Sequence, residues 1–225
     1  GNDNERALSK FKTVAKDFPG SGEAMQAVST ARLIYIDLGR VDHYATWVRT
    51  LGYVEITDVE LDNTTYLAAE KPYLDNETDK AIRQFNNYLN QFPNGIHALK
   101  SHFYLAQLYY KKDLFDNAQP HYKYVIDASK SEYTEQATVK LCEIYLTSSK
   151  WSQAITVLLR LENDADYPQN VIYAQSNLMN AYYQTEDYVK ADVYAEKVLI
   201  NTSLDTKVTS DAKIIIARAA IKTGN

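Results

Sequence analysis

Glycine, proline and cysteine are scarce in this chain of 225 residues, which contains seven, five and one of them. So few glycines and prolines disfavour an all-β fold, because such a fold needs many tight turns. The single cysteine, Cys142, excludes a disulfide bond within the chain. Apolar residues nevertheless make up 45% of the sequence, so there is enough apolar material for a substantial core.

Clusters of lysine and arginine and long apolar runs are also missing. The formal net charge is −5, and no basic cluster of the kind that binds nucleic acid occurs. No run of 18 apolar residues could cross a bilayer, and no signal peptide is present. We therefore expect no nucleic-acid partner and no direct insertion into a membrane.

Motifs that carry chemistry are absent as well. His97 and His102 are five residues apart, so they lie on different faces of a helix and make no metal pair. The stretch 75–79 resembles a calcium loop, but Lys80 and Asn86 stand where its glycine and its glutamate belong. No phosphate-binding loop, nucleophile elbow or zinc-helix motif occurs. We expect no catalytic residue, no metal and no cofactor, and an enzyme with a site between helices is a remote alternative.

What the sequence does contain is an internal repeat. Its anchor positions are spaced by 37, 37, 37, 36 and 37 residues and hold Ala7, Tyr44, Ala81, Ala118, Ala154 and Ala191. Apolar side chains recur four and seven residues after each anchor, which is the spacing of one helical face. Phe92-Pro93-Asn94-Gly95 then ends the helix anchored at Ala81. A period this regular indicates a stack of helix pairs.

The residues before each anchor follow the same period. Nine residues earlier, four repeats carry a tyrosine, namely Tyr35, Tyr109, Tyr145 and Tyr182. Small residues such as Ala106 and Cys142 lie three residues before that tyrosine, where two helices approach closely. Two residues before the anchor stand residues that we predict to be N-caps of the second helix, namely Asp42, Asp79, Asp116 and Ser152.

These positions resemble the tetratricopeptide (TPR) repeat, whose pattern contains Tyr, then Ala-x3-Phe, then Pro. Ala81, Phe85 and Pro93 match it, and so do Ala7, Phe11 and Pro19. Gly39 and Gly224 fall where such repeats often carry a turn glycine. The resemblance covers nearly the whole chain. The two to three surplus residues per unit lie after the anchor, as in the periplasmic TPR proteins of Gram-negative bacteria of the Tol-Pal-associated and outer-membrane-assembly types. This similarity implies a bacterial protein in the periplasm or at the outer membrane, with the cytoplasm as the alternative.

The resemblance implies an all-α fold, a right-handed α-α superhelix of about twelve helices. We expect residues 1–225 to form a single array of five full pairs between two half repeats, at about 4–18 and 207–222. In the weakest unit we expect an extended connection at 54–56 and a helix near 62–75, kinked or ended by Pro72. The last helix is apolar on more than one face. We therefore expect a fragment of a longer array, or an end that self-associates.

In proteins of this kind the first helix of each pair lines a concave groove, at positions 15, 11, 8 and 7 residues before the anchor. Carried onto this sequence, the candidate peptide-binding residues are Tyr66, Glu70, Tyr73, Leu74, Phe103, Gln107, Tyr110, Lys111, Val139, Glu143, Leu146, Thr147, Ser176, Asn180, Tyr183 and Gln184. Aromatic rings among amides suit an extended peptide. The alternative is that these rings pack on the neighbouring repeat.

The resemblance therefore implies a non-enzymatic scaffold that binds a protein or peptide in this groove. A structural spacer, or a self-assembling segment of a larger TPR protein, is the alternative.

Overall fold

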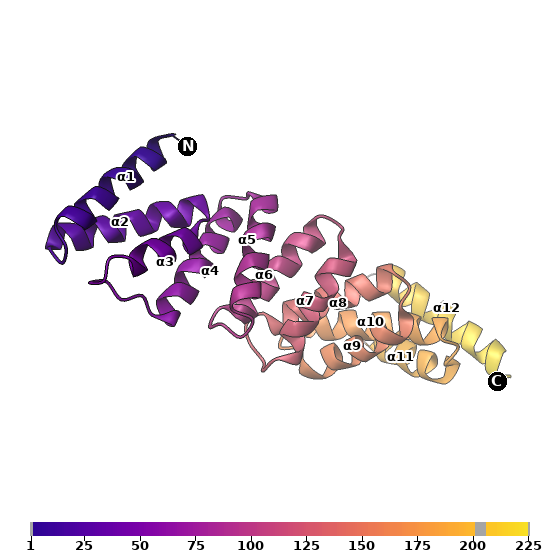
Figure 1. Cartoon of the computed structure of the whole chain (residues 1–225). Helices are drawn as coiled ribbons and strands as arrows, with labels where there is room; N and C mark the ends of the chain where they lie inside the picture. Colours follow the sequence, from indigo (N-terminus) through magenta and orange to yellow (C-terminus); the bar gives the residue numbers. More distant parts are fainter. Residues whose placement is uncertain (1, 201–205, 225) are drawn as a thin grey trace. The chain divides into compact units, whose positions relative to one another are not determined.

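The computed structural model describes residues 2–200 and 206–224, and in these ranges the chain forms helices and no strand (Figure 1). The helices, in chain order, are α1 (Asn2–Asp17), α2 (Gly22–Leu38), α3 (Val41–Arg49), α4 (Asp58–Leu74), α5 (Thr78–Gln91), α6 (Ala98–Lys111), α7 (Phe115–Asp127), α8 (Thr134–Thr147), α9 (Trp151–Asp164), α10 (Pro168–Gln184), α11 (Tyr188–Ile200) and α12 (Thr206–Thr223). None of these helices is both long and apolar enough to cross a membrane.

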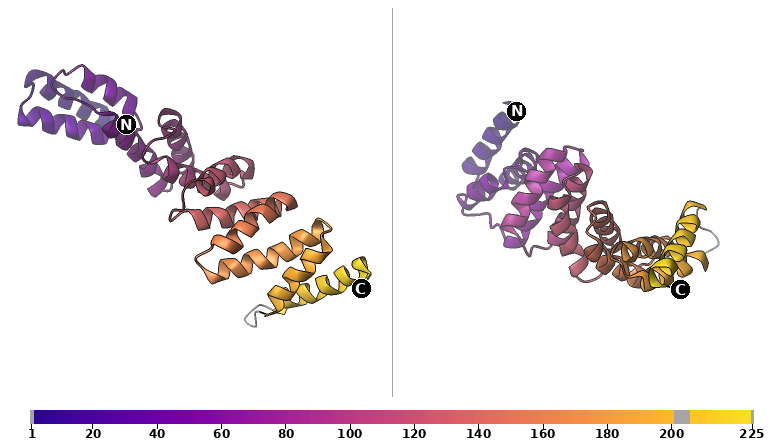
Figure 2. Two further views of the ribbon diagram at one scale, coloured as in Figure 1. Left: turned by 90° about the horizontal axis from the view of Figure 1, so that it is seen from below. Right: turned by 90° about the vertical axis from the view of Figure 1, so that its right-hand side faces the viewer.

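The chain divides into two compact units, residues 1–113 with α1 to α6 and residues 114–225 with α7 to α12. Within each unit, consecutive helices pack against one another as hairpins (Figure 2). The first helices of successive pairs also touch, α2 with α4 in the first unit and α10 with α12 in the second. The predicted all-α fold of stacked helix pairs is therefore confirmed, with α2, α4, α6, α8, α10 and α12 as first helices of the pairs.

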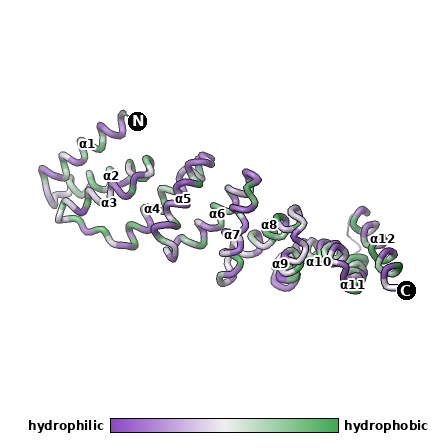
Figure 3. Tube along the Cα trace, turned by 45° about the vertical axis from the view of Figure 1, so that its right-hand side comes forward, coloured by the Kyte–Doolittle hydropathy of each residue, from purple (hydrophilic) through white to green (hydrophobic). Residues whose placement is uncertain are grey.

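Each helix buries one face against its neighbours, and this face carries the apolar positions that recur with the period of the sequence. In the second unit the anchors Ala118, Ala154 and Ala191 are fully buried. The residues four and seven positions after them are buried too, namely Tyr122, Leu158, Ala195, Val125, Leu161 and Val198. Hydrophobic and hydrophilic residues accordingly alternate within each helix (Figure 3). Burial of such stripes holds the pairs together, because no single pair encloses a core.

The predicted N-caps are wrong by two residues. The second helices begin at Val41, Thr78, Phe115 and Trp151, so Asp42, Asp79, Asp116 and Ser152 lie inside the first turn. The residues at the N-cap make no capping bond with their side chains; they are Arg40, Glu77, Leu114 and Lys150. The three aspartates still favour the helices, because a negative charge in the first turn interacts well with the helix dipole.

The reason for this early start is the turn between the two helices of each pair. Five residues before each of the last five anchors, the backbone adopts a left-handed conformation, with φ between 53° and 65°, at Gly39, Asn76, Asp113, Ser149 and Glu186. In the fourth turn the N–H of Ser149 donates to the Leu146 carbonyl at 3.1 Å, and that of Lys150 to the Tyr145 carbonyl at 2.8 Å. This pattern closes the first helix and leads directly into the second. Only the first of these turns has the glycine that the sequence pattern indicates.

Replacing Ser149 by glycine is expected to raise the free energy of unfolding by about 0.5–1 kcal/mol, because a residue with a Cβ is strained at φ 53°. The neighbouring Ser148 is a matched control, since its φ is −86°. Glycine at Ser148 should be neutral or destabilising. Urea denaturation of both variants tests this, and a stabilised Ser148→Gly with an unchanged Ser149→Gly would contradict it.

In the weakest repeat, residues 54–57 form an extended connection without strand pairing, as predicted. Helix α4 starts at Asp58, four residues earlier than expected, because Thr57 and Glu60 form a capping box. Pro72 lies in the last turn of α4. The connection packs on the core around α1 to α3, and the Tyr53 hydroxyl donates to the Ala15 carbonyl at 2.5 Å.

Candidate functional site

In the first unit, the candidate residues at the C-terminal ends of α4 and α6 come together. The rings of Tyr73 and Tyr104 stack with centroids 4.2 Å apart, and the Tyr73 hydroxyl donates to Gln107 Oε1 at 3.0 Å. Beside them lies a depression of about 360 Å³, lined by Tyr73, Leu74, Asn76, Thr78, Gln107, Leu108 and Lys111. Four of these are candidate positions from the sequence, namely Tyr73, Leu74, Gln107 and Lys111.

Two candidate residues of this unit lie inside the structure. Tyr66 and Phe103 are only 3% and 4% exposed. The Tyr66 ring stacks on His97, at the start of the next helix pair, with centroids 4.0 Å apart. The Tyr66 ring therefore packs between repeats, which is the alternative that the sequence left open, and both Tyr66 and Phe103 offer a partner almost no surface.

Glu70 joins this packing through a hydrogen-bonded cluster with Tyr66 and Lys100. Its Oε1 accepts from the Tyr66 hydroxyl at 2.5 Å and from Lys100 Nζ at 2.9 Å. Lys100 Nζ also lies 5.4 Å from the centroids of both the Tyr66 and Tyr104 rings, within cation–π range. Burial opposes the charge on Glu70, but the bonds from Tyr66 and Lys100 outweigh it and lower the pKa of the carboxyl. Glu70 and Lys100 therefore form an ionised pair at neutral pH. The sequence pattern had not identified Lys100 or Tyr104 as part of this cluster.

A second polar cluster fastens the turn between α5 and α6 to α4. Asp62, almost fully buried, accepts from the Tyr88 hydroxyl at 2.7 Å and from the Ile96 N–H at 3.0 Å. The Tyr88 hydroxyl in turn accepts from the His97 N–H at 3.1 Å. A Cβ added at Gly95 would come within 2.5 Å of both Asp62 and Tyr88, so only glycine fits there. This cluster is structural, because its groups bond to one another rather than to solvent.

In the second unit, α10 and α12 border a depression of about 420 Å³. Its lining residues are Gln169, Ile172, Tyr173, Ser176, Asn177, Met179, Asn180, Lys207, Val208 and Asp211. The candidate residues Ser176 and Asn180 are among them. The amide of Asn180 donates to the Ser176 carbonyl at 3.2 Å, and that of Asn177 to the Tyr173 carbonyl at 2.8 Å. Hydrogen-bonding amide and hydroxyl groups thus surround an opening that contains a few apolar side chains.

The other candidate residues of the second unit lie near this depression or on α8. The ring of Tyr183 contacts the edge of Tyr188, with centroids 5.5 Å apart, and Gln184 is exposed at the end of α10. On α8, Glu143 pairs with Lys140 at 2.7 Å. Val139 lines a depression of about 480 Å³ between α8 and α10, while Leu146 is half-buried and Thr147 exposed. Tyr110, in the first unit, is half-buried.

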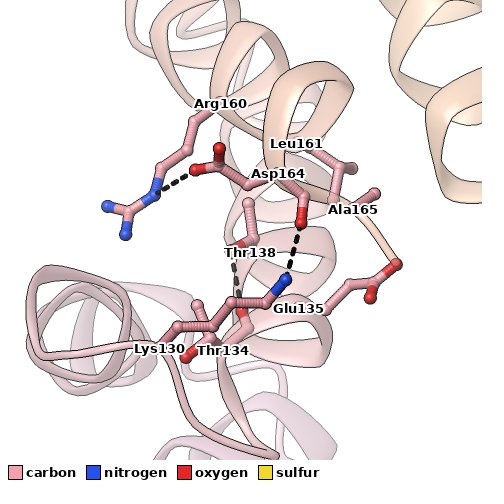
Figure 4. A pocket seen from close by; sticks show the side chains of 8 residues that line it. All are labelled: Lys130, Thr134, Glu135, Thr138, Arg160, Leu161, Asp164 and Ala165. Atoms are coloured by element: carbon pink, nitrogen blue, oxygen red, sulfur yellow. Dashed lines mark hydrogen bonds and ion pairs between the residues drawn. The ribbon is translucent and has the colours of Figure 1, made fainter. Parts of the chain in front are cut away.

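A smaller cavity of about 40 Å³ lies under the loop between α9 and α10 (Figure 4). Lys130 Nζ donates to the Asp164 carbonyl at 3.1 Å, and Arg160 pairs with the Asp164 carboxylate at 3.7 Å. The nearby Glu135 accepts from the N–H groups of Asp166 and Tyr167 at 3.0 and 3.2 Å. The charged groups around this cavity therefore join the loop between α7 and α8 to the loop between α9 and α10. The cavity itself has room only for water.

Two titratable side chains that could serve catalysis are shielded from solvent, Cys142 fully and His121 in part. Burial raises the pKa of the Cys142 thiol to about 12 and lowers the pKa of His121 to about 4, so both are neutral at pH 7. In the part of the chain that the structure describes, no three His, Cys, Asp or Glu side chains come together as metal ligands would.

Cys142 is accordingly expected to react with a thiol reagent at least about a hundredfold more slowly in the native chain than in denaturant, because the thiolate is the reactive form. The release of chromophore at pH 8, with and without guanidinium, measures this. Equal rates in the two conditions would show that the thiol is accessible.

Comparisons with known proteins give structural similarity only. No family model and no curated protein matches the chain. Among solved structures, the TPR domain of P58(IPK) matches 99% of this chain and 67% of its own, with 15% identity and a TM-score of 0.42. A tetratricopeptide repeat protein from Parabacteroides merdae matches 99% and 81%, with 13% identity and a TM-score of 0.36. With TM-scores this low, the fold assignment depends on the helix pairs of the chain itself.

Proposed function

We propose that this protein is a non-enzymatic scaffold that binds a protein or peptide on the surface formed by the first helices of its pairs. The observation that carries the proposal is the position of the depressions. Those at α4–α6, at α8–α10 and at α10–α12 each contain residues that the TPR resemblance marks for binding, among them Gln107, Lys111, Val139 and Asn180.

The chemistry of these depressions supports a polypeptide as the bound molecule. Amides and hydroxyls can satisfy the N–H and C=O groups of a peptide, and the intervening rings and aliphatic side chains can hold its apolar residues. Packing instead accounts for the buried Cys142, the half-buried His121 and the polar clusters around Asp62 and Glu70. A location in the periplasm or at the outer membrane is part of this proposal and depends on the resemblance of the repeat.

Selection from a random peptide library on the immobilised chain, followed by calorimetric titration of the enriched peptides, tests the proposal. Tyr183→Ala with Asn180→Ala removes the candidate contacts of the second unit, and Gln107→Ala with Lys111→Ala removes those of the first. We expect one of these pairs to weaken binding about tenfold or more, since each buried contact of this kind contributes about 1 kcal/mol or more.

The matched control is Tyr124→Ala with Gln153→Ala, which alters exposed residues of the second helices α7 and α9. This pair should leave affinity unchanged. Failure to enrich any peptide, or loss of binding only in the control pair, would exclude the proposed surface.

Self-association is the second candidate, and one observation favours it. A depression of about 380 Å³ between α1 and α2 is lined partly by Phe11, Val14 and Ala27, and α12 exposes Ile214 and Ile221. Sedimentation velocity over a range of concentrations decides between the two. A protein that remains monomeric at every concentration would exclude self-association.

A further inference from the structure

Helix α12 differs in charge from the rest of the chain. It contains four basic residues, Lys207, Lys213, Arg218 and Lys222, and a single acidic one, Asp211, whereas the whole chain has a net charge of −5. Lys213, Arg218 and Lys222 are exposed, and in the described part of the chain none of the three forms an ion pair. Within the part of the chain that the structure describes, the charges of Lys213, Arg218 and Lys222 are thus not balanced by ion pairs.

The same helix exposes apolar side chains between these charges. Ile214 and Ile221 are 46% and 79% exposed and lie two turns apart on one face. Arg218 lies between them along the same face, while the adjoining face buries Ala212, Ile215 and Ala219 against its own unit. We call the surface of Ile214, Arg218, Ile221 and Lys222 the α12 face.

The α12 face continues the candidate binding surface within the second unit. Ile214 and Ile221 lie one period of 37 residues after Asn177 and Gln184 of α10, which hold the repeat positions, 14 and 7 residues before an anchor, that Leu67 and Leu74 hold on α4. Both leucines are likewise exposed. The depression between α10 and α12 is lined by Val208, Asp211 and Asn180, and Asp211 precedes Ile214 by about one helical turn.

We infer that the α12 face binds an acidic, amphipathic polypeptide segment, an inference that rests on the proposed scaffold function. Carboxylates of such a segment pair with Arg218 and Lys222, and its apolar side chains cover Ile214 and Ile221. Complementary charges of this kind speed association and discriminate against partners of the wrong charge.

A polypeptide fits the surroundings better than an anionic membrane does. The apolar part of the face is narrow, since the guanidinium of Arg218 separates the two isoleucines along the helix. The neighbouring amides of Asn177 and Asn180 and the Asp211 carboxylate would have to enter the lipid with it. Hydrogen-bonding groups of this kind suit a peptide backbone and disfavour burial in a lipid phase.

The experiment measures fluorescence anisotropy of a labelled peptide that carries leucines and glutamates, added to the whole chain. An otherwise identical peptide with glutamine at every glutamate is the reference. The acidic peptide should bind about tenfold tighter or more, and its advantage should shrink as salt is raised. Equal binding of the two peptides would overturn the inference.

Two variants locate the site. Arg218→Glu with Lys222→Glu should weaken binding of the acidic peptide about tenfold or more, and Ile221→Gln should weaken it as well. The control Lys10→Glu with Lys16→Glu makes the same charge change at exposed positions of α1 and should have little effect. An equally large loss of affinity in the control would mean that net charge alone attracts the peptide. That result would overturn the assignment of the peptide site to the α12 face.

Two further outcomes separate this inference from the proposed function. Library peptides that bind through Tyr183 or Gln107 without any preference for acidic residues would leave the scaffold function intact and overturn the α12 face. Alternatively, the protein binds vesicles that contain phosphatidylserine, loses this binding in the Arg218→Glu/Lys222→Glu variant, and does not bind the acidic peptide. This outcome would replace the polypeptide with a membrane surface and so overturn the inference too.

Discussion

Replacing Phe85 by alanine is expected to lower the free energy of unfolding by about 3–5 kcal/mol, the largest effect of any substitution considered for this protein. Phe85 is fully buried, and its ring lies 5.9–6.4 Å from the rings of Tyr66, Tyr73 and Tyr104, measured between centroids. Alanine would leave a cavity at the centre of this aromatic cluster, which holds α4, α5 and α6 together.

Urea denaturation followed by circular dichroism measures the loss, and Phe18 provides the control. Phe18 is 60% exposed in the loop after α1, so Phe18→Ala should change the free energy of unfolding by less than about 0.5 kcal/mol. A large loss of unfolding free energy for Phe85→Ala and a small one for Phe18→Ala would support the helical register that places Phe85 in the core. Equal midpoints for Phe85→Ala and the unaltered chain would show that the register is wrong.

Asp62→Ala is expected to cost about 2–4 kcal/mol, because it removes the acceptor of the buried Tyr88 hydroxyl and of the Ile96 N–H. Hydrogen exchange should then rise at the turn between α5 and α6, since Asp62 is one of the groups that tie this turn to α4. Asn at the same position keeps one acceptor and should lose less.

The control for Asp62 is Asp116→Ala. The side chain of Asp116 is 97% exposed and lies 3.7 Å from Lys150, an exposed ion pair that contributes little. Its loss should cost less than about 1 kcal/mol. A chain that tolerates Asp62→Ala as well as it tolerates Asp116→Ala would show that the buried cluster does not hold the turn.

The sequence predicted the helices and their pairing because that information is local. A helical face repeats every three to four residues, and apolar side chains at the anchors and at the fourth and seventh residues after them mark this face directly. The turn glycine Gly39 was also readable, because a left-handed residue is most often glycine. That the two units form one array stays a prediction, since it concerns residues across the boundary between them.

The starts of the second helices were not readable in the same way. Asn76, Asp113, Ser149 and Glu186 adopt the left-handed conformation without being glycine. Asn and Asp tolerate this conformation best after glycine, so they indicate the turn weakly, whereas Ser149 and Glu186 do not indicate it at all. The predicted caps at Asp42, Asp79, Asp116 and Ser152 were consequently two residues late.

By itself, then, the sequence determined which face of each helix is buried, because periodicity along the chain expresses that choice. Only the tertiary structure decided that Tyr66 and Phe103 pack inside while Gln107, Lys111 and Asn180 line depressions, although the repeat pattern marks all five as candidate binding positions. It likewise decided that Glu70 pairs with Lys100, thirty residues away. Such contacts depend on the distance and angle between neighbouring helix pairs, and these follow from the packing of many side chains together rather than from any local pattern.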